Sequence, residues 1–470
     1  MTGFLWLTRD FRFTDNSALL AAIGDGPLLV VFFIDRALCK QGAASRWRLE
    51  RALRCYDSAL RHRSGRGVLI LEGEPDRLLP DIVQQTGARR VHQGDFPTAA
   101  TRTTQDRLRA ALPPQVELVL HPGHLLAQPA AIRTAGGGSY RVFTPFARAL
   151  RRFGPDVPQP EAPQRFGAAD PPVRGIDIAR LDLAPDLHRG RAVLDRFALP
   201  AGEDRARERL DGFLDRLSGY AEGRDRPDRA AISELSEHLA LGEISPRTVW
   251  AAAELRAQSN PAISGEVEKF LTEVIWRDFA WHLLIAFPDM AQMPWRPEWR
   301  GFPWQGEGPE LRRWERAETG IALVDAGLRE MRVTGRMHNR VRMVVASWLT
   351  KHMLTDWRLG LRHFEQSLTD WDPASNAMNW QWVAGCGPDA SPFFRIFNPE
   401  TQAERFDPKG AYRARWLPGP RQPTAEAEAY YDTLPPGWTV PPLWRPREDD
   451  AVSEGRKHAL ESYQAFRRLS

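Results

Sequence analysis

The chain contains the unbroken apolar run Leu28-Leu-Val-Val-Phe-Phe-Ile34, and this stretch decides the fold. A short apolar run without polar alternation is typical of a strand that is buried on both faces of a parallel sheet. Together with Pro27 it is the longest apolar run in the sequence, and it is far too short to cross a bilayer. We therefore expect a protein that has no contact with a membrane.

Other apolar runs of this type flank it along the first part of the chain. The further predicted strands are residues 4–7, 68–71, 90–92 and 116–120. Stretches with a helical period, such as residues 45–61 and 76–86, separate them. This alternation predicts a doubly wound α/β domain with a mainly parallel sheet. Because no GxGxxG motif follows the first strand, the pattern leaves the ligand of this domain open.

The second half of the sequence has a different pattern. Helical periods dominate in residues 204–216, 233–240, 246–256, 267–287, 321–331 and 337–354. Between residues 155 and 172 six prolines mark a stretch that is typical of a linker. We expect an α/β domain over residues 1–130, an interdomain linker over residues 131–203 and a larger all-α domain over residues 204–470.

The composition is that of a globular protein, with 42% hydrophobic and 26% charged residues among 470. These values exclude a disordered or collagen-like chain. The three cysteines, Cys39, Cys55 and Cys386, form no CxxC pair, so we expect neither a disulfide framework nor a metal site. Arg9 and Asp10 interrupt the apolar N-terminus, which therefore lacks the order of a secretory signal. We expect a cytoplasmic protein.

The basic residues are almost all arginine. The formal net charge is +4, the sequence pI is about 9.1, and five lysines stand against 59 arginines. Arginine makes planar, two-point contacts with phosphate, so the charge permits nucleic-acid binding. Genomic codon bias explains the same excess, because the sequence has no compact basic run.

Tryptophan is concentrated in the second half. All but two of the 17 tryptophans lie between Trp250 and Trp444. A large aromatic core explains such a density, and so does a site that stacks planar rings or passes electrons between indoles. Spacing does not separate these explanations.

Three residues share one face of the predicted helix over residues 270–282. Glu273, Trp276 and Arg277 are three and four positions apart, so an acceptor, a flat ring and a cation point the same way. They can form the wall of a pocket that binds a base. Alternatively, Glu273 and Arg277 form an ordinary solvated ion pair.

Polar residues also open the helix predicted after residue 334. His338 and Arg342 share one face, Asn339 and Met343 share an adjacent face, and an apolar run follows. This order predicts a helix whose first turns line a polar cavity.

A second polar segment, residues 370–385, joins acids, asparagines and tryptophans with little amphipathic order. We expect Asp370 to pair with Arg342. Asp372 and Asn376 would contact the polar edge of a bound heterocycle.

Serines mark two predicted helix starts. Ser233 and Ser245 are plausible N-caps, and Pro246 follows the second at the first helical position. Capping alone explains both. If Ser233 and Ser236 face a ligand instead, their hydroxyls and the free amides of the helix would suit a pyrophosphate.

Several long motifs resemble one known family. They are Trp6-Leu-Thr-Arg-Asp-Phe-Arg-Phe-Thr-Asp-Asn-Ser-Ala-Leu19, Tyr140-Arg-Val-Phe-Thr-Pro-Phe146 and residues 335–343, 370–385 and 393–399. The chain resembles the DNA photolyase/cryptochrome family and is similar to class I cyclobutane pyrimidine dimer photolyases. The resemblance implies a lyase that binds FAD and UV-damaged DNA and acts as a monomer, with an antenna-type α/β domain and a helical FAD-binding catalytic domain. In the implied reaction, light drives an electron from reduced FAD to a flipped-out dimer, which opens.

The resemblance also implies site residues. The FAD would be held by Tyr220, Ile232, Ser233, Glu234, Leu235, Ser236, Arg342, Asp370 and Asp372, with Asn376 near its N5 edge. The dimer and the DNA would be contacted by Arg224, Glu273, Trp276, Arg277, Asn339, Arg340, Met343, Trp382 and Arg395. Electron transfer between the flavin and the surface would use Trp304, Trp357 and Trp380.

The sequence departs from the family pattern at several positions. Ile232 replaces a common threonine, and Glu234 replaces a frequent basic residue. Arg336 replaces an aromatic residue, and Ala377 replaces a second asparagine. Residues 96–101 lack the Asn-Glu pair of folate-antenna members, so the antenna chromophore stays open between methenyltetrahydrofolate, a deazaflavin and none.

Two other light-dependent functions share this scaffold. A cryptochrome-type blue-light photoreceptor usually carries Asp where Asn376 stands, in the plant type. A (6-4) photoproduct photolyase typically has paired histidines where His338 and Asn339 stand. A plain nucleotide-binding module or electron-transfer flavoprotein would leave the face of Glu273 and Trp276 unexplained. We therefore expect repair of cyclobutane pyrimidine dimers.

Overall fold

The computed structural model of the chain describes residues 2–187, 190–389, 393, 395–419 and 423–469. Its N-terminal half is built on a five-stranded parallel sheet in the order β3-β2-β1-β4-β5. The strands are β1 (Gly3–Leu7), β2 (Leu28–Ile34), β3 (Leu69–Glu72), β4 (Arg90–Gly94) and β5 (Glu117–His121). The five predicted strands and the doubly wound α/β architecture are confirmed.

The sheet is covered on both faces, as the run at β2 predicts. The main covering helices are α1 (Ser17–Asp25), α3 (Ala43–Ser64), α4 (Pro75–Thr86) and α5 (Ala99–Ala111). Leu28, Val30 and Phe32 of β2 pack in one core with residues of α1 and α3. The alternate residues Leu29, Val31 and Phe33 pack in a second core with residues of α4 and α5. Both faces of β2 are therefore buried, which accounts for its lack of polar residues.

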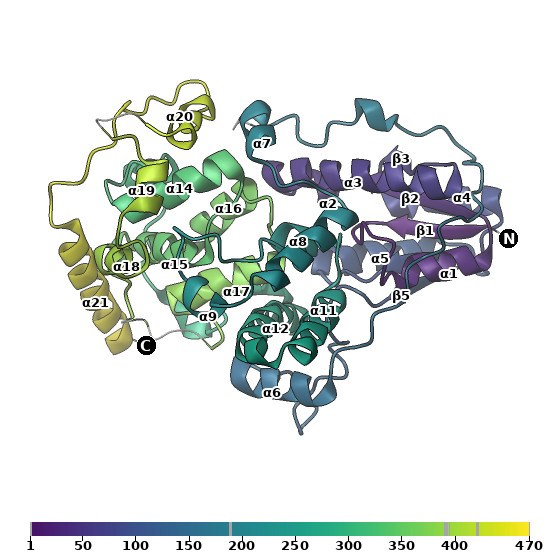
Figure 1. Cartoon of the computed structure of the whole chain (residues 1–470), viewed down its shortest axis with the longest axis horizontal. Helices are drawn as coiled ribbons and strands as arrows, with labels where there is room; N and C mark the ends of the chain where they lie inside the picture. The colour runs from purple at the N-terminus through teal and green to yellow at the C-terminus, as the bar shows by residue number, and fades with distance from the viewer. Residues whose placement is uncertain (1, 188–189, 390–392, 394, 420–422, 470) are drawn as a thin grey trace.

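The rest of the chain is helical, and Figure 1 shows it beside the sheet domain. Its longer helices are α6 (Phe143–Phe153), α8 (Glu203–Asp215), α11 (Pro246–Ser259), α12 (Ser264–Ala286), α14 (Ala322–Thr334), α15 (Asn339–Ser347), α16 (Trp357–Ser367), α17 (Pro373–Ala384), α18 (Pro399–Phe406), α20 (Ala425–Asp432) and α21 (Ala451–Leu469). Shorter helical segments are α2 (Arg36–Cys39), α7 (Arg191–Phe197), α9 (Tyr220–Gly223), α10 (Ser236–Leu241), α13 (Pro309–Glu315), α19 (Ala411–Trp416), the 3-10 turns η1 (Ile178–Arg180), η2 (Pro261–Ile263), η3 (Pro288–Ala291) and η4 (Pro297–Gly301), and the π-helical turn η5 (Trp348–His352). The helical C-terminal domain is confirmed.

Residues 131–203, which we expected to link the domains, include helices. Helix α6 packs on α12, and its residues Phe146, Ala147 and Leu150 are buried in the core of the helical half. The proline-rich stretch begins after α6 ends, so the prolines do not interrupt this helix. The domain boundaries themselves stay a prediction.

Three local predictions have different outcomes. Ser245 caps α11, because its side chain accepts the amide of Thr248. Ser233 caps no helix, because α10 begins at Ser236 after Glu234 enters the left-handed region with φ of 51°. The predicted helix over residues 337–354 begins at Asn339 and passes into a π-helical turn at Trp348.

A buried ionic network joins the two halves. The guanidinium of Arg48 on α3 contacts Glu237 at 2.7 Å and Glu243 at 2.6 Å, and all three side chains are buried. The hydroxyl of Thr369 donates to the same Glu237 at 2.6 Å. Buried charges are stable only when they are paired in this way, so the network fixes α3 against α10 and against the segment that leads into Asp370.

The described part of the chain lacks two kinds of feature. No helix there is long and apolar enough to span a membrane. No group of three or more His, Cys, Asp or Glu side chains among these residues is arranged to hold a metal ion.

Candidate active site

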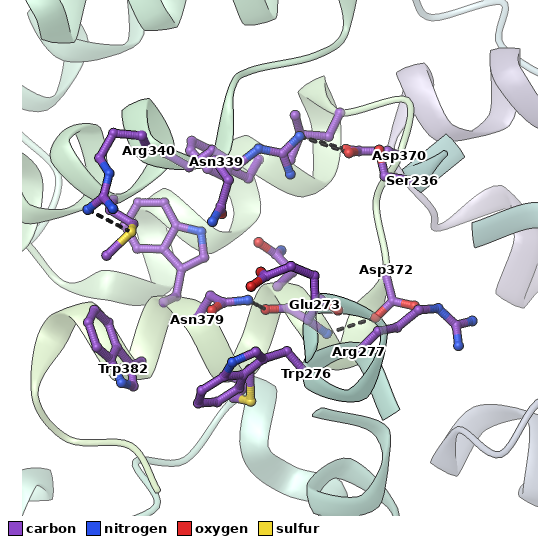
Figure 2. Close-up of a pocket in the computed structure, with 18 of the residues that line it drawn as sticks. Ser236, Glu273, Trp276, Arg277, Asn339, Arg340, Asp370, Asp372, Asn379 and Trp382 are labelled. Carbon is purple, nitrogen blue, oxygen red and sulfur yellow. Dashed lines mark hydrogen bonds and ion pairs between the residues drawn. The ribbon is translucent and has the colours of Figure 1, made fainter. Parts of the chain in front are cut away.

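A cavity of about 830 Å³ lies within the helical domain, and Figure 2 shows the side chains around it. Ligand pockets usually enclose about 300–1,000 Å³. Of the residues predicted from the sequence, the cavity is lined by Arg224, Ser233, Leu235, Ser236, Glu273, Trp276, Arg277, Asn339, Arg340, Arg342, Met343, Asp370, Asp372, Asn376, Trp380, Trp382 and Arg395. Tyr220, Ile232, Glu234, Trp304 and Trp357 lie outside this lining.

One wall carries an ion pair in which a single guanidinium nitrogen contacts both oxygens of a carboxylate. The guanidinium of Arg342 on α15 donates to both carboxylate oxygens of Asp370, at 3.0 and 2.8 Å. The Nε of Arg342 donates to the carbonyl of Met337 at 2.8 Å. The predicted pairing of Asp370 with Arg342 is confirmed, and these bonds hold the arginine in one orientation at the cavity wall.

The start of α17 carries the next two polar side chains. Asp372 is the N-cap of α17 and accepts the amide of Ser375 at 2.8 Å and the indole N–H of Trp281 at 2.9 Å. Asn376 lies one turn later and donates its amide N–H to the carbonyl of Leu361 at 3.1 Å. This bond fixes the carboxamide of Asn376 in the cavity wall and directs its oxygen away from the Leu361 carbonyl.

The loop before α10 supplies hydroxyl groups. Ser233 and Ser236 line the cavity on either side of Glu234. The carboxylate of Glu234 contacts Arg209 at 2.6 Å, and Ile232 is 37% exposed. Ile232 and Glu234, the two residues that depart from the family pattern here, are part of the loop, but their side chains do not line the cavity.

Tyr220 is buried beside the cavity wall. Its ring packs edge-on against Phe213 and Phe270 at 5.5 and 6.0 Å. Phe270 itself lines the cavity. Tyr220 thus supports the wall through Phe270.

The residues suit a dinucleotide such as FAD. The cavity offers a fixed arginine, two hydroxyls and a carboxamide. Trp371 also lines it, and its buried indole N–H has no partner among the described residues. A buried donor of this kind is costly unless a ligand or water satisfies it.

Helix α12 presents Glu273 and Trp276 to the cavity. Glu273 forms an ion pair with Arg224, and the ring of Trp276 stacks on Phe143 with centroids 3.5 Å apart. The guanidinium of Arg277 donates to the carbonyl of His124 at 2.8 Å. Glu273 and Arg277 therefore have separate partners, and the alternative of a solvated ion pair between them is wrong.

The guanidinium groups at the cavity differ in their surroundings. The Arg277 side chain is 11% exposed and packs toward the α/β domain. Arg340 contacts Asp225 at 2.9 Å and lies over the ring of Phe406 at 4.5 Å. Arg395 is exposed. A phosphate would reach Arg340 and Arg395 more readily than Arg277.

The three tryptophans predicted to carry electrons differ in burial. Trp380 lines the cavity and is 2% exposed, Trp357 is fully buried, and Trp304 is half-buried. A backbone bond of 2.9 Å from the amide of Asp356 to the carbonyl of Gln305 joins the segments next to Trp357 and Trp304. The electron path through these three residues stays a prediction.

Burial shifts the pKa of groups near the cavity. It lowers the pKa of His338, the N-cap of α15, to about 4. It raises the pKa of Asp278, next to Arg277, to about 7. The imidazole of His338 is therefore neutral at neutral pH.

Sequence reasoning missed several residues at the cavity. The cavity is also lined by Asp225, Lys269, Asn379 and Asp389. Phe143 stacks on the ring of Trp276. Asn379 lies three residues from both Asn376 and Trp382, so helical spacing could have found it. Phe143 and Asp389 lie far from α12 in sequence, and no local pattern could have indicated them.

The comparison with known proteins agrees with this geometry. Residues 4–164 match the family described as DNA photolyase, and residues 270–434 match the FAD binding domain of DNA photolyase. The deoxyribodipyrimidine photo-lyase of Agrobacterium fabrum is 40% identical over 88% of this chain and 86% of its own length. A deoxyribodipyrimidine photo-lyase of Thermus thermophilus is 37% identical over 90% of this chain and 95% of its own length. The chain therefore belongs to the DNA photolyase family.

Solved structures have the same fold. The crystal structure of a class III photolyase from Agrobacterium tumefaciens matches with a TM-score of 0.85 and 36% identity, covering 99% of this chain and 97% of the other. A Synechocystis cryptochrome matches with a TM-score of 0.82 and 24% identity over 100% and 99% of the two chains, which is a likeness of fold alone. The resemblance to the family is confirmed, whereas its class I detail is not.

Proposed function

We propose that this chain repairs cyclobutane pyrimidine dimers in DNA in a light-driven reaction that depends on bound FAD. The observation that carries the proposal is the cavity of the helical domain, where a fixed arginine and a carboxamide meet two tryptophans that can stack on bases. The relatives that cover most of the chain are named deoxyribodipyrimidine photo-lyase. Carbon–carbon lyase activity follows from this reaction, because the dimer's cyclobutane bonds are cleaved.

The cofactor side of the cavity is the wall of α15, α17 and the loop before α10. Reduced FAD, when bound, supplies the electron that light drives into the dimer. Arg342, oriented by Asp370, would hold the cofactor, with Ser233 and Ser236 at its phosphates. Asn376 would present its carboxamide oxygen to the flavin edge, because its N–H is already bonded to Leu361.

The DNA side of the cavity is the wall of α12 and the outer turns of α15 and α17. Trp276 and Trp382 would flank the flipped pyrimidines, and Glu273, Asn339 and Met343 would contact them. Flipping costs a few kcal/mol in enzymes that act on extruded bases, and less for a damaged, weakly stacked pair. The phosphates would meet Arg224, Arg340 and Arg395 rather than Arg277, which is bound to His124.

The tryptophan path would return oxidised flavin to its active state. Trp380, Trp357 and Trp304 would pass an electron inward from the surface to the flavin. This path is separate from repair, because repair by reduced flavin needs no electron from the protein.

Three further predictions belong with this function. The protein would act as a monomer in the cytoplasm. An antenna chromophore, methenyltetrahydrofolate or a deazaflavin, would absorb light for the flavin if one is bound. Size-exclusion chromatography and the absorption spectrum of the purified protein test the first and last of these.

The deciding experiment mixes chemically reduced protein with oligothymidine that carries cyclobutane dimers. Thymine absorbance should return in blue light and not in the dark. The control is Trp276→Ala, which should weaken dimer binding by roughly 1–3 kcal/mol, the value of one stacked base. No recovery of absorbance by protein with bound flavin would overturn the proposal and would favour (6-4) repair or a photoreceptor.

A further inference from the structure

One face of Trp276 is already covered by another ring. Phe143, the first residue of α6, lies parallel to the indole, with centroids 3.5 Å apart and an angle of 2° between the planes. Phe279, which is fully buried, meets both rings edge-on at 5.8 and 5.9 Å. Trp276 lines the cavity and Phe143 does not, so the uncovered part of the indole is the part that faces the cavity.

The start of α6 is anchored at two points. The amide of Phe143 donates to Oδ2 of Asp389 at 3.2 Å, which satisfies one of the free amides at a helix start. The amide of Tyr140 donates to Nε2 of His282 at 2.9 Å. Burial lowers the pKa of His282 to about 4, so the neutral ring is able to accept this bond.

We propose that Phe143 is a positioning residue for the substrate, which fixes the Trp276 ring so that its open face receives a flipped pyrimidine. A side chain that is held before binding loses less conformational freedom when the ligand arrives. The inference rests on the proposed function, because it takes Trp276 as a stacking surface for the dimer. Phe143 lies in the segment that the sequence predicts to be a linker, and the proposal assigns this segment a role in substrate binding.

The test measures binding in the dark of an oligonucleotide with one thymine dimer and of the same oligonucleotide without damage. Phe143→Ala should weaken dimer binding roughly 3- to 10-fold, the range of an aromatic pair. Binding of undamaged DNA and FAD content should not change. Phe143→Tyr, which keeps the flat ring, should retain the affinity of the unmodified chain. The matched control is Phe153→Ala, because Phe153 lies at the other end of α6 and is 53% exposed.

A double variant that also carries Trp276→Ala distinguishes a positioning role of Phe143 from a general effect on stability. In the Trp276→Ala background, Phe143→Ala should cause no further loss of dimer affinity, because the ring that it positions is gone. In light, Phe143→Ala should raise the half-saturating concentration of dimer DNA and leave the repair rate at saturation unchanged. If Phe143→Ala fails to fold, Phe143→Leu keeps the apolar volume without the flat ring and should give the same loss.

The outcomes separate this inference from the function on which it rests. An unmodified chain that binds damaged and undamaged DNA equally would overturn the proposed function. An unmodified chain that prefers the dimer, with a Phe143→Ala variant that keeps this preference, would overturn the positioning role alone. The same holds if Phe143→Ala weakens dimer binding as strongly in the Trp276→Ala background.

Discussion

Gly360 on α16 makes room for the indole of Trp380. A methyl group on Gly360 would lie 2.1 Å from Cη2 of that ring, far inside van der Waals contact. Trp357 lies one helical turn before Gly360. The glycine therefore lets the cavity-lining tryptophan pack against the helix that carries the next tryptophan of the proposed path.

Gly360→Ala should displace the Trp380 ring and slow the light-driven reduction of oxidised FAD. Overpacking of this kind costs about 1–3 kcal/mol of the free energy of unfolding. Repair by chemically reduced protein should continue, because it needs no electron from Trp380. Flavin absorbance during illumination with an external reductant measures the first effect, and the oligothymidine assay measures the second.

Gly212→Ala is the matched control, because Gly212 lies on α8 and an added methyl meets nothing within 4 Å. It should leave flavin reduction unchanged. Trp380→Phe should abolish the same reduction. Normal flavin reduction in Trp380→Phe would show that electrons take another path.

Asp370→Asn should lower the affinity for FAD. The substitution removes the charge that fixes the guanidinium of Arg342, and hydrogen bonds to charged groups contribute about 1.5–3 kcal/mol. We expect the dissociation constant for FAD to rise about 10- to 100-fold. Flavin absorbance after dialysis gives the bound fraction.

The control for Asp370→Asn is Glu208→Gln, which removes one partner of the exposed pair with Arg205. Exposed pairs contribute little, so flavin content should not change. Equal flavin retention in both variants would remove Asp370 from the cofactor site.

Arg48→Met should destabilise the whole fold. It leaves Glu237 and Glu243 buried without their cation, and breaking a buried pair costs about 3–5 kcal/mol. Urea denaturation followed by circular dichroism measures the loss. Arg51→Ala, on the same helix but partly exposed beside Asp195, should cost less than about 1 kcal/mol. An equal loss of unfolding free energy in the two variants would argue against the idea that the Arg48 network holds the two halves together.

His282 makes the start of α6 sensitive to acid. Burial lowers its pKa from 6.5 to about 4, so its contribution to stability is present above about pH 6.5 and is lost as the pH falls toward 4. His282→Gln keeps an acceptor for the Tyr140 amide but does not titrate. The stability of the unmodified chain relative to this variant should fall by up to about 3 kcal/mol between pH 7 and pH 4. A difference that does not change with pH would contradict the buried, neutral histidine.

Local patterns predicted the elements and faces that depend on near neighbours in sequence. The strands follow from apolar runs, and the faces of α12 and α15 follow from spacings of three and four residues. The pairing of Arg342 with Asp370 could be predicted from the sequence, because both residues lie in polar segments that lack the pattern of a solvent-exposed helix face. The capping role of Ser233 was wrong, since Glu234 takes a left-handed conformation that delays α10.

Other features depend on contacts between distant parts of the chain. Arg277 and Glu273 share a helical face, yet Arg277 binds His124 from the loop after β5. The side chains of Ile232 and Glu234 do not line the cavity, although both residues stand in a predicted cofactor loop. The partners that decide these outcomes come from other elements, and no spacing along the sequence contains them.

The sequence by itself determined the two fold classes, the family and most of the residues that line the cavity, because hydrophobic period and motif chemistry are local properties. Only the tertiary structure decided which partner each guanidinium group at the cavity has and which ring supports Trp276. Those outcomes depend on which side chains meet between elements that lie far apart in the sequence. A buried charge without a partner is costly, and the element that packs against each of these side chains supplies its partner.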